Sequence, residues 1–320
     1  MTKWTKKSYD EEEMEKKLLE PYEYLVPLRI YGFVVSKLPE AYNYWLKIPE
    51  DKLQPIQKIL VKLNNSFAMQ DDVQDESLYR RSRPTAHRVF GKALTINTSI
   101  HLQFLALKDI TQLGHPKCVE VFCNAYLRLV RGAGAAIYWR DHQCDVTLDD
   151  YFQMAINQSG SELIFLPELM QLFSENKTSY EYLAKMFSIY YQLRDEYVDL
   201  KKPEAVEEGA RISELTGLST LTFCDDFTEG KFSAPVIHAL KGPHREVILG
   251  ILKMRTRDIQ VKKYLLSLLE ASGSIAKTRE LLHELEADIL TEIRRLGGNP
   301  VFEALMCDLQ SWDERTYYSK

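Results

Sequence analysis

The stretch Met69–Arg81 reads MQDDVQDESLYRR and follows an apolar run that begins at Ile59. On a helix, Asp71 and Asp75 are four positions apart, so their side chains lie one above the other. Two carboxylates at the end of a buried helix are costly without a cation between them. Mg²⁺ suits this role, because it binds one or two carboxylates and completes its shell with water and phosphate oxygens. The spacing therefore indicates a magnesium site.

Two arginines, Arg80 and Arg81, follow the aspartates and are suited to anionic oxygens that a metal leaves open. An acidic stretch taken alone is more often a solvated helix face. A second stretch over residues 190–200, YYQLRDEYVDL, repeats the pattern, because Asp195 and Asp199 are again four apart after an apolar helix. Two such stretches on separate long helices indicate acidic walls that face each other across a cavity.

A cavity with carboxylates at its mouth and an apolar interior suits a substrate with a polyanionic head and a hydrocarbon tail. The head would be a diphosphate bridged by Mg²⁺, which would favour C–O cleavage by withdrawing charge from the leaving group. Lys231, within DDFTEGKF, is a further candidate for a phosphate contact. A solvated lysine at a helix N-terminus explains this spacing about equally well.

Length and composition indicate a globular protein. With 320 residues, 45% hydrophobic and 27% charged, the chain can bury a sizeable core, and its net charge of −5 argues against a nucleic-acid surface. No apolar run of about 18 residues is present, so we expect no transmembrane segment. The charged start lacks the apolar segment of a signal peptide. The five cysteines show no CxxC spacing and indicate reduced thiols in a cytoplasmic protein.

Apolar residues recur at spacings of three and four almost everywhere, so the sequence predicts an all-α protein. The expected helices cover residues 9–20, 22–38, 50–75, 91–112, 116–139, 147 onward, 178–200, and several shorter segments within 228–315. The first of them is expected to stop near Pro21, and residues 201–219 are expected to form a loop or lid. No linker or repeat is present, so we expect a single domain over 1–320, with helices around a deep central cavity.

Local signals mark particular points along these helices. Gly132 and Gly134 are expected to let a neighbouring helix approach closely. Thr147 is expected to cap the next helix, with acidic residues in its first turn. That helix is expected to be interrupted at residues 159–160, where Ser and Gly are adjacent.

At these residues the sequence resembles the trans-isoprenyl diphosphate synthases, and specifically the geranylgeranyl diphosphate synthases of animals and fungi. The resemblance covers nearly the whole chain and rests on seven segments, in order: LLEPYEYL, WLKIPEDKL, DDVQDESLYRRSRPTAH, IYWRD, YYQLRDEY, FTEGKFSAPVIHAL and GGNP. It implies the all-α isoprenoid synthase fold, with two aspartate-rich motifs that hold three Mg²⁺ ions and thereby bind an allylic diphosphate.

The resemblance assigns the acidic residues to these two motifs, which carry the catalysis and face each other. The first motif consists of Asp71, Asp72 and Asp75. The second consists of Asp195, Glu196 and Asp199. The metal ligands would be Asp71, Asp75 and Asp195. The glutamate of the second motif stands where the family usually has aspartate.

Further positions match residues of the family that bind substrate. Arg80 matches the arginine on the allylic diphosphate. Arg81 matches one used for the second substrate, isopentenyl diphosphate. Gln192 and Lys231 match further substrate-binding positions.

The sequence departs from the family where isopentenyl diphosphate binds. The family's early Gly-Lys-x-x-Arg corresponds to residues 32–36, GFVVS, so both cations are missing, although a one-residue slip would let Lys37 replace one in part. Other family residues are replaced as well: His or Gln by Asn64, Lys-Thr by Gln158-Ser159, a lysine by Leu221, and Gln and Asp by Ala133 and Ala136.

Each lost cation matters, because a diphosphate carries about three charges and each charge-assisted hydrogen bond contributes roughly 1.5–3 kcal/mol. Losing several weakens isopentenyl diphosphate binding by orders of magnitude, whereas the metal ligands remain. Such an enzyme would form an allylic cation that only its own double bonds or water could attack. That is terpene synthase chemistry, and the apolar replacements fit a dry pocket around a carbocation.

Phe67 bears on the length of the substrate. In the family, the residues four and five positions before the first aspartate line the floor of the chain pocket, and large aromatic side chains there shorten the product. Phe67 is four positions before Asp71, so it would favour a C15 substrate over a C20 substrate. A phenylalanine of the protein core fits this position at least as well.

The sequence therefore predicts a Mg²⁺-dependent class I terpene synthase that acts on farnesyl or geranylgeranyl diphosphate. One alternative is a prenyltransferase that condenses isopentenyl diphosphate with an allylic diphosphate, its missing cations supplied from other positions. Another is a weakly active regulatory subunit of such a synthase. The oligomeric habit of the family implies a homodimer or a higher homo-oligomer.

Overall fold

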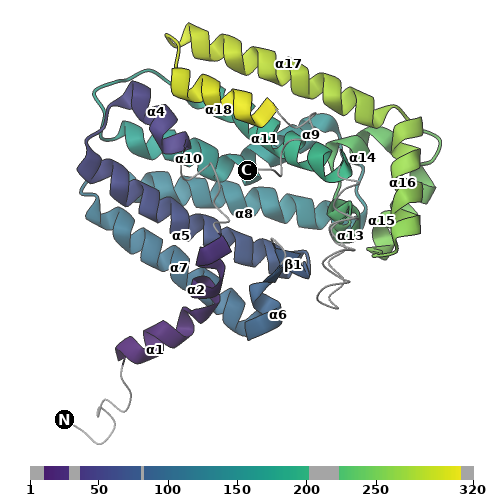
Figure 1. Ribbon diagram of the computed structural model, residues 1–320, viewed down its shortest axis with the longest axis horizontal. Coiled ribbons are helices and arrows are strands. Elements are labelled where there is room, and N and C mark those ends of the chain that lie inside the picture. The colour runs from purple at the N-terminus through teal and green to yellow at the C-terminus, as the bar shows by residue number, and fades with distance from the viewer. Residues whose placement is uncertain (1–10, 29–36, 81–82, 202–222, 311–320) are drawn as a thin grey trace, which may run out of the picture. The chain divides into compact units, whose positions relative to one another are not determined.

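The computed structural model describes residues 11–28, 37–80, 83–201 and 223–310 (Figure 1). Helices dominate these residues, and the two strands among them have two residues each, which confirms the predicted all-α class. Contacts divide the chain into two compact units. The first consists of Met1–Ser36 and Gln54–Gly114, and the second of Lys37–Leu53 and His115–Lys320. The single-domain organisation stays a prediction.

The first unit contains six helical segments and a short hairpin among its described residues. They are α1 (Glu11–Leu18), α2 (Glu20–Leu25), the 3₁₀ helix η1 (Val26–Leu28), α5 (Glu50–Gln74, in this unit from Gln54 onward), β1 (Tyr79–Arg80), β2 (Arg83–Pro84), α6 (Ala86–Phe90) and α7 (Lys92–Gln112).

The second unit contains a larger set of helices among its described residues. They are α4 (Leu38–Leu46), α8 (Cys118–His142), α9 (Leu148–Gln158), α10 (Gly160–Gln171), α11 (Glu181–Lys201), α13 (Asp225–Glu229), α14 (Ala234–Ala239), α15 (Arg245–Met254), α16 (Ile259–Ala271), α17 (Ser274–Arg295) and α18 (Pro300–Gln310).

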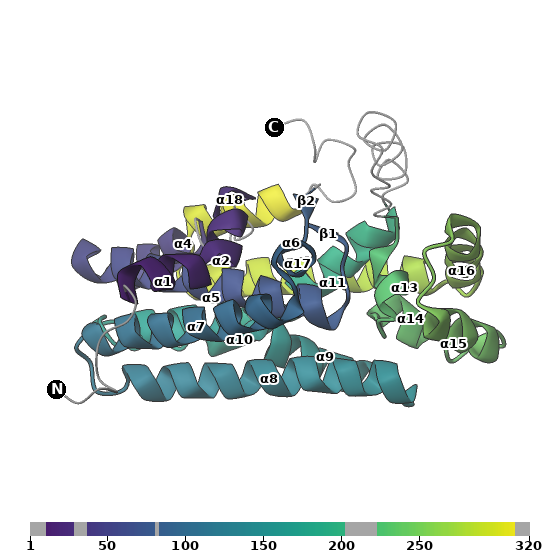
Figure 2. The same ribbon diagram turned by 90° about the horizontal axis from the view of Figure 1, so that it is seen from below.

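The core of the first unit joins α5, the helix that carries the first acidic stretch, to α2, α6 and α7. Met69 packs in one apolar cluster with Leu25, Ala86 and Leu102. The helices α5 and α7 run side by side (Figures 1 and 2) and are also joined by a buried hydrogen bond of 3.0 Å between the hydroxyls of Ser66 and Ser99. Burial on this face holds the C-terminal end of α5 in place.

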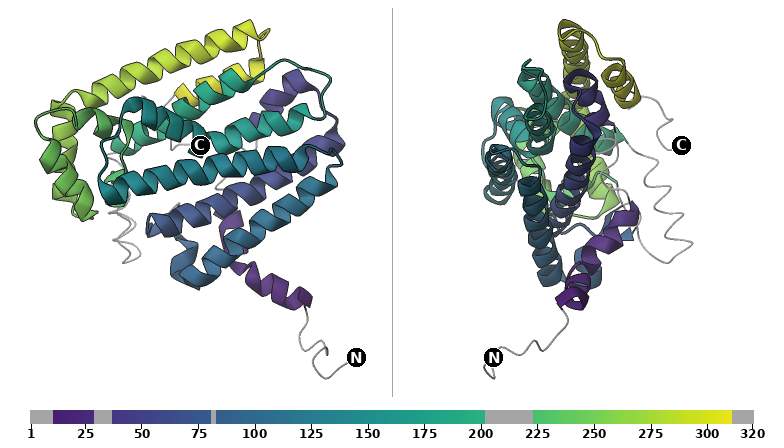
Figure 3. Two further views of the ribbon diagram at one scale, coloured as in Figure 1. Left: turned by 180° about the vertical axis from the view of Figure 1, so that it is seen from behind. Right: turned by 90° about the vertical axis from the view of Figure 1, so that its left-hand side faces the viewer.

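The helix α11, which carries the second acidic stretch, packs against α9, α10 and α17 in the core of the second unit. Most of its upstream residues are buried, and the Tyr190 hydroxyl donates to the carboxylate of Glu286 on α17 at 2.9 Å. Figure 2 shows α8 alongside α9 and α10, and Figure 3 shows α17 ending beside α18, the yellow helix at the C-terminal end. The last turns of α11 are thus anchored from several sides.

Several expected helix boundaries are confirmed. Thr147 forms a capping box, because its side chain accepts from the backbone N–H of Asp150 and the Asp150 carboxylate accepts from Thr147. The expected interruption occurs at Ser159, between α9 and α10. The first helix ends at Leu18, close to the expected stop near Pro21, and this proline lies in the first turn of α2, where its missing N–H is harmless.

The two glycines of α8 differ in their surroundings. A Cβ atom added to Gly132 would lie 2.6 Å from the backbone nitrogen of Gln158, so the close approach of α8 to the end of α9 requires glycine here. The same expectation for Gly134 was wrong, because nothing lies within 4 Å of its added Cβ. Among the described residues, no helix combines the length and apolar composition needed to cross a membrane.

The pair of glycines gives a matched test of this packing. Gly132→Ala should lower the free energy of unfolding by about 1–3 kcal/mol, since backbone atoms must move to admit the methyl group. Gly134→Ala should raise it by about 0.5–1 kcal/mol, because alanine favours a helix and meets no neighbour. Urea unfolding measures both, and equal effects of the two substitutions would contradict the described contact.

Candidate active site

The end of α5 turns the chain back over its own aspartates. The backbone N–H of Ser77 donates to the carbonyl of Asp72 at 3.0 Å, and Glu76 has a φ of 57°. This is the Schellman arrangement, in which a left-handed residue ends the helix. The chain then enters the β1–β2 hairpin, in which Arg80 is opposite Arg83. Arg80, which follows α5 in the chain, thereby lies beside the C-terminal end of this helix.

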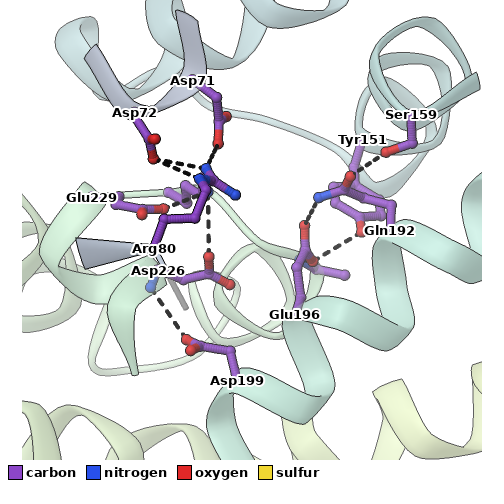
Figure 4. A network of polar contacts seen from close by, with 12 residues as sticks. Asp71, Asp72, Arg80, Tyr151, Ser159, Gln192, Glu196, Asp199, Asp226 and Glu229 are labelled. Carbon is purple, nitrogen blue, oxygen red and sulfur yellow. Dashed lines mark hydrogen bonds and ion pairs between the residues drawn. The ribbon is translucent and has the colours of Figure 1, made fainter. Parts of the chain in front are cut away.

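Arg80 bridges two carboxylates of the first acidic stretch (Figure 4). Its Nε lies 2.9 Å and its Nη2 2.8 Å from Oδ1 of Asp72, and the same Nη2 lies 3.0 Å from Oδ2 of Asp71. Charge-assisted contacts of this length are strong, and a planar guanidinium suits two carboxylates at once. The structure therefore brings together two aspartates of the predicted first motif and the arginine predicted to bind the diphosphate.

Burial sets the electrostatics of this group. Asp72 is fully buried, and this burial raises the pKa of its carboxyl to about 6, against the opposing effect of the Arg80 charge. Its Oδ2 atom is buried and has no hydrogen-bond partner among the described residues. Asp75 is also buried, whereas the Asp71 side chain is 41% exposed. One arginine thus compensates an acidic group that is partly withdrawn from water.

These residues fit a Mg²⁺ ion by the chemistry of their donors. Carboxylate oxygens are hard ligands, and the buried Oδ2 of Asp72 is an acceptor that no protein donor occupies. No group of three or more His, Cys, Asp or Glu side chains suited to hold a metal occurs among the described residues. The fit therefore depends on one or two carboxylates together with phosphate oxygens, which is how proteins commonly bind Mg²⁺.

Neighbouring residues of the second acidic stretch have opposite environments. Asp195 is exposed, with 53% of its side chain accessible, and lies 3.2 Å from the buried guanidinium of Arg194. Glu196 is buried and accepts hydrogen bonds from the Tyr151 hydroxyl at 2.9 Å and from the Ala234 backbone N–H at 3.0 Å. Burial raises the pKa of the Glu196 carboxyl to about 7, and these donors oppose that rise.

Gln192 connects Glu196 to the helix break at Ser159 (Figure 4). Its Nε2 donates to Oε1 of Glu196 at 3.0 Å, and its Oε1 accepts from the hydroxyl of Ser159. Tyr151 was assigned no role from the sequence, and Ser159 was noted only with Gln158 as the replacement of the family's Lys-Thr pair, because no local pattern connects either residue to position 192. The expected interruption of the helix at residues 159–160 was a second signal for Ser159.

A third acidic group lies around α13 and was missed from the sequence. The Asp226 backbone N–H donates to Asp199 at 3.2 Å, and the Lys231 ammonium lies 3.6 Å from Oδ1 of Asp226 and pairs with Glu229. Burial raises the pKa of the Asp226 carboxyl, and Lys231 opposes this. Lys231 lies between the end of α13 and the start of α14 and is half-buried, so the alternative of a solvated lysine at a helix N-terminus stays open. The signal was present as the acidic residues of DDFTEGKF.

The remaining predicted residues are placed only in part. Asn64 and Phe67 lie half-buried on α5. Arg81, residues 32–36 and Leu221 lie outside the described residues. The first motif belongs to the first unit and the second motif to the second unit. That they face each other across a cavity stays a prediction.

The comparisons with known proteins agree on one protein family. The model of the polyprenyl synthetase family matches residues 15–269. A protein named terpene synthase from Matsumurasca onukii is 42% identical over 306 residues, which cover 95% of this chain and 96% of that protein. Proteins named geranylgeranyl pyrophosphate synthase are 38% identical in Mucor circinelloides f. lusitanicus, over 92% of this chain and 93% of that protein, and 33% identical in Dictyostelium discoideum, over 95% and 96%.

Removing the charge of Arg80 should have a pH-dependent effect. The pKa of the Asp72 carboxyl is about 6 in the folded protein and lower in the unfolded chain, so ionising this group costs folding free energy. This cost is absent at pH values below the unfolded pKa and is complete at pH values above about 6. Arg80→Gln should therefore lower the free energy of unfolding by about 1–3 kcal/mol at pH 7.5, and by less at pH 5.

Urea unfolding in metal-free buffer at the two pH values measures this effect. Lys92→Gln is the matched control, because Lys92 pairs with Glu76 at 3.1 Å while both side chains are more than half exposed. Its effect should stay within about 0.5 kcal/mol at either pH. An Arg80→Gln effect that grows from pH 7.5 to pH 5 would refute the role of Arg80 as counter-charge to Asp72.

Proposed function

From the premise that this chain belongs to the polyprenyl synthetase family, we propose that it is a Mg²⁺-dependent class I terpene synthase. As a member of this family it is an enzyme that acts on prenyl diphosphates. The proposed reaction ionises farnesyl or geranylgeranyl diphosphate and yields a terpene hydrocarbon or alcohol plus diphosphate.

One observation carries the proposal: the acidic motifs are retained while most of the cations for a second diphosphate are replaced. Of the positions named above, Arg81 keeps its charge, whereas residues 32–36, Asn64 on α5 and Gln158 at the end of α9 carry none. Lys37, the one cation that a shifted alignment could supply, lies 2.6 Å from the carboxylate of Asp308. The 42% identity to a protein named terpene synthase supports the same reading.

The protein side chains would act by binding and by compensating charge. Arg80 would exchange its contacts with Asp71 and Asp72 for oxygens of the allylic diphosphate, because a guanidinium binds either anion. The carboxylates of the two motifs, among them Asp75 and Asp195, would hold up to three Mg²⁺ ions. When bound, these ions would stabilise the negative charge on the departing diphosphate. The apolar residues around the tail would exclude water from the carbocation.

The second candidate is a prenyltransferase that extends an allylic diphosphate with isopentenyl diphosphate. The relatives named geranylgeranyl pyrophosphate synthase, at 38% and 33% identity over more than nine tenths of this chain, favour it. A weakly active regulatory subunit of such a synthase is the third. A homodimer or higher homo-oligomer and a cytoplasmic location are proposed with each of them, from the family resemblance and the composition.

One assay separates these candidates. The purified protein is incubated with Mg²⁺ and with geranyl, farnesyl or geranylgeranyl diphosphate, each with and without isopentenyl diphosphate, and the products are identified by mass spectrometry. A hydrocarbon or alcohol from a single substrate supports the terpene synthase. A longer diphosphate formed only with both substrates would establish the prenyltransferase instead. Absence of turnover in every mixture would favour the regulatory subunit.

The metal assignment predicts the effect of removing single carboxylates. Asp71→Ala and Asp195→Ala should each lower kcat/KM at least about a hundredfold, because charge on the leaving group is then less stabilised. Both side chains are more than a third exposed, so both variants should keep the unfolding temperature within a few degrees of the wild-type value. Asp149→Ala, at an exposed aspartate of α9, is the control. Retained turnover in both variants would refute the metal assignment.

The position of Phe67 predicts a change of substrate preference. Phe67→Ala should shift the ratio of kcat/KM for geranylgeranyl over farnesyl diphosphate upward by at least about tenfold, because the smaller side chain leaves room for a longer tail. Competition of the two substrates in one reaction measures the ratio directly. An unchanged ratio in a folded variant would assign Phe67 to the protein core instead.

A further inference from the structure

Four side chains of the second unit form one continuous polar chain around Gln192 (Figure 4). The hydroxyl of Ser159 donates to Oε1 of Gln192, and Nε2 of Gln192 donates to Oε1 of Glu196 at 3.0 Å. The hydroxyl of Tyr151 donates to the other oxygen of Glu196 at 2.9 Å. The residues come from α9, the α9–α10 junction and α11, so the packing of these helices determines the chain of contacts.

Glu196 is held as an acceptor in this group. Three donors reach its two oxygens: the Gln192 amide, the Tyr151 hydroxyl and the backbone N–H of Ala234 at the start of α14. The residue is only 4% exposed. A buried carboxyl with this many donors is positioned by the protein, in contrast to the exposed carboxylate of the adjacent Asp195.

The position of Ser159 is constrained from two sides. On one side, the close approach of Gly132 fixes the backbone of Gln158, which immediately precedes the serine. On the other, a Cβ atom added to Gly160 would lie 2.9 Å from the hydroxyl oxygen of Ser188 on α11. These close contacts hold the backbone on both sides of Ser159, whose hydroxyl donates to Gln192.

These contacts define the orientation of the Gln192 amide. A glutamine side chain has two N–H groups and a carbonyl oxygen. One N–H is directed at Glu196 and the oxygen is directed at Ser159, so a flip of the amide would place its oxygen against the acceptor Glu196 and lose that bond. Because the amide group is planar, the direction of the N–H that points at Glu196 also determines the direction of the second N–H of Gln192.

We propose that Tyr151, Ser159 and Glu196 are positioning residues that orient Gln192, so that its second N–H donates to an oxygen of the diphosphate of the substrate. The inference rests on the proposed function, since the resemblance assigns Gln192 to substrate binding. It adds a reason why a glutamate occupies position 196. The longer side chain reaches both the Gln192 amide and the Tyr151 hydroxyl while Asp195 stays exposed for a metal.

The experiment compares hydroxyl removal at two serines of the same helix break. Ser159→Ala removes the bond to Gln192, and Tyr151→Phe removes a donor to Glu196. Ser161→Ala is the matched control, because the Ser161 hydroxyl donates only to the backbone carbonyl of Gln158 at 2.7 Å. Ser159→Thr restores a hydroxyl. Each variant is measured for KM and kcat with the prenyl diphosphate that the wild type uses, for the Kd of inorganic diphosphate with Mg²⁺ by calorimetry, and for unfolding temperature.

We expect Ser159→Ala and Tyr151→Phe to raise both KM and the Kd of inorganic diphosphate by about three- to tenfold, with kcat within about twofold, since the lost contact is made equally in the ground state and the transition state. Ser159→Thr should return both constants to within about twofold of the wild type, and Ser161→Ala should leave them unchanged. Equal Kd values for Ser159→Ala and the wild type, or equal increases for Ser159→Ala and Ser161→Ala, would overturn the proposal.

The binding measurement separates this proposal from the proposed function. A wild type that turns over no prenyl diphosphate, but whose Kd for inorganic diphosphate rises in Ser159→Ala, would refute the enzyme assignment and support the positioning role. A wild type with terpene synthase activity and no change of Kd or KM in Ser159→Ala or Tyr151→Phe would support the enzyme assignment and refute the positioning role.

Discussion

The cost of withdrawing carboxyl groups from water governs both acidic stretches. Each stretch lies at the end of an apolar helix whose packing carries some of its acidic residues into the interior. Even against the groups that compensate them, burial raises the pKa of Asp72 to about 6 and that of Glu196 to about 7. Neither carboxyl would be tolerated there without compensation, so the surrounding structure supplies it.

The compensation differs in kind between the two sites. Asp72 is balanced by the charge of Arg80, while one of its oxygens keeps no hydrogen-bond partner among the described residues. Glu196 is balanced by neutral donors that reach both of its oxygens. An arginine held by carboxylates can exchange them for another anion, whereas a fully hydrogen-bonded carboxyl is a fixed structural element. The first arrangement suits binding of metal and diphosphate, and the second suits orientation of a neighbour.

The ends of helices lie beside the compensating groups. The left-handed residue Glu76 ends α5 and returns Arg80 to the aspartates. Ser159 lies between α9 and α10 with a φ of −66° and a ψ of −35°, and its hydroxyl donates to Gln192 next to the close contact at Gly132. A helix that continued beyond Glu76 would direct Arg80 elsewhere.

The amino-acid sequence by itself determined the features that depend on local spacing. The helical class, the capping box at Thr147, the four-residue spacing of Asp71 and Asp75, and the interruption at residues 159–160 all follow from periodicity and capping. The family motifs add the roles expected of these residues.

Only the tertiary structure decided which partners the acidic residues have. Tyr151 lies 45 residues before Glu196 in the chain, and Asp226, whose backbone N–H donates to Asp199, lies 27 residues after it. Contacts over such separations depend on how helices pack, and a 3.6-residue period carries no information about them. The same reason explains why Gly132 and Gly134 looked alike in the sequence, although a neighbouring backbone approaches only the first.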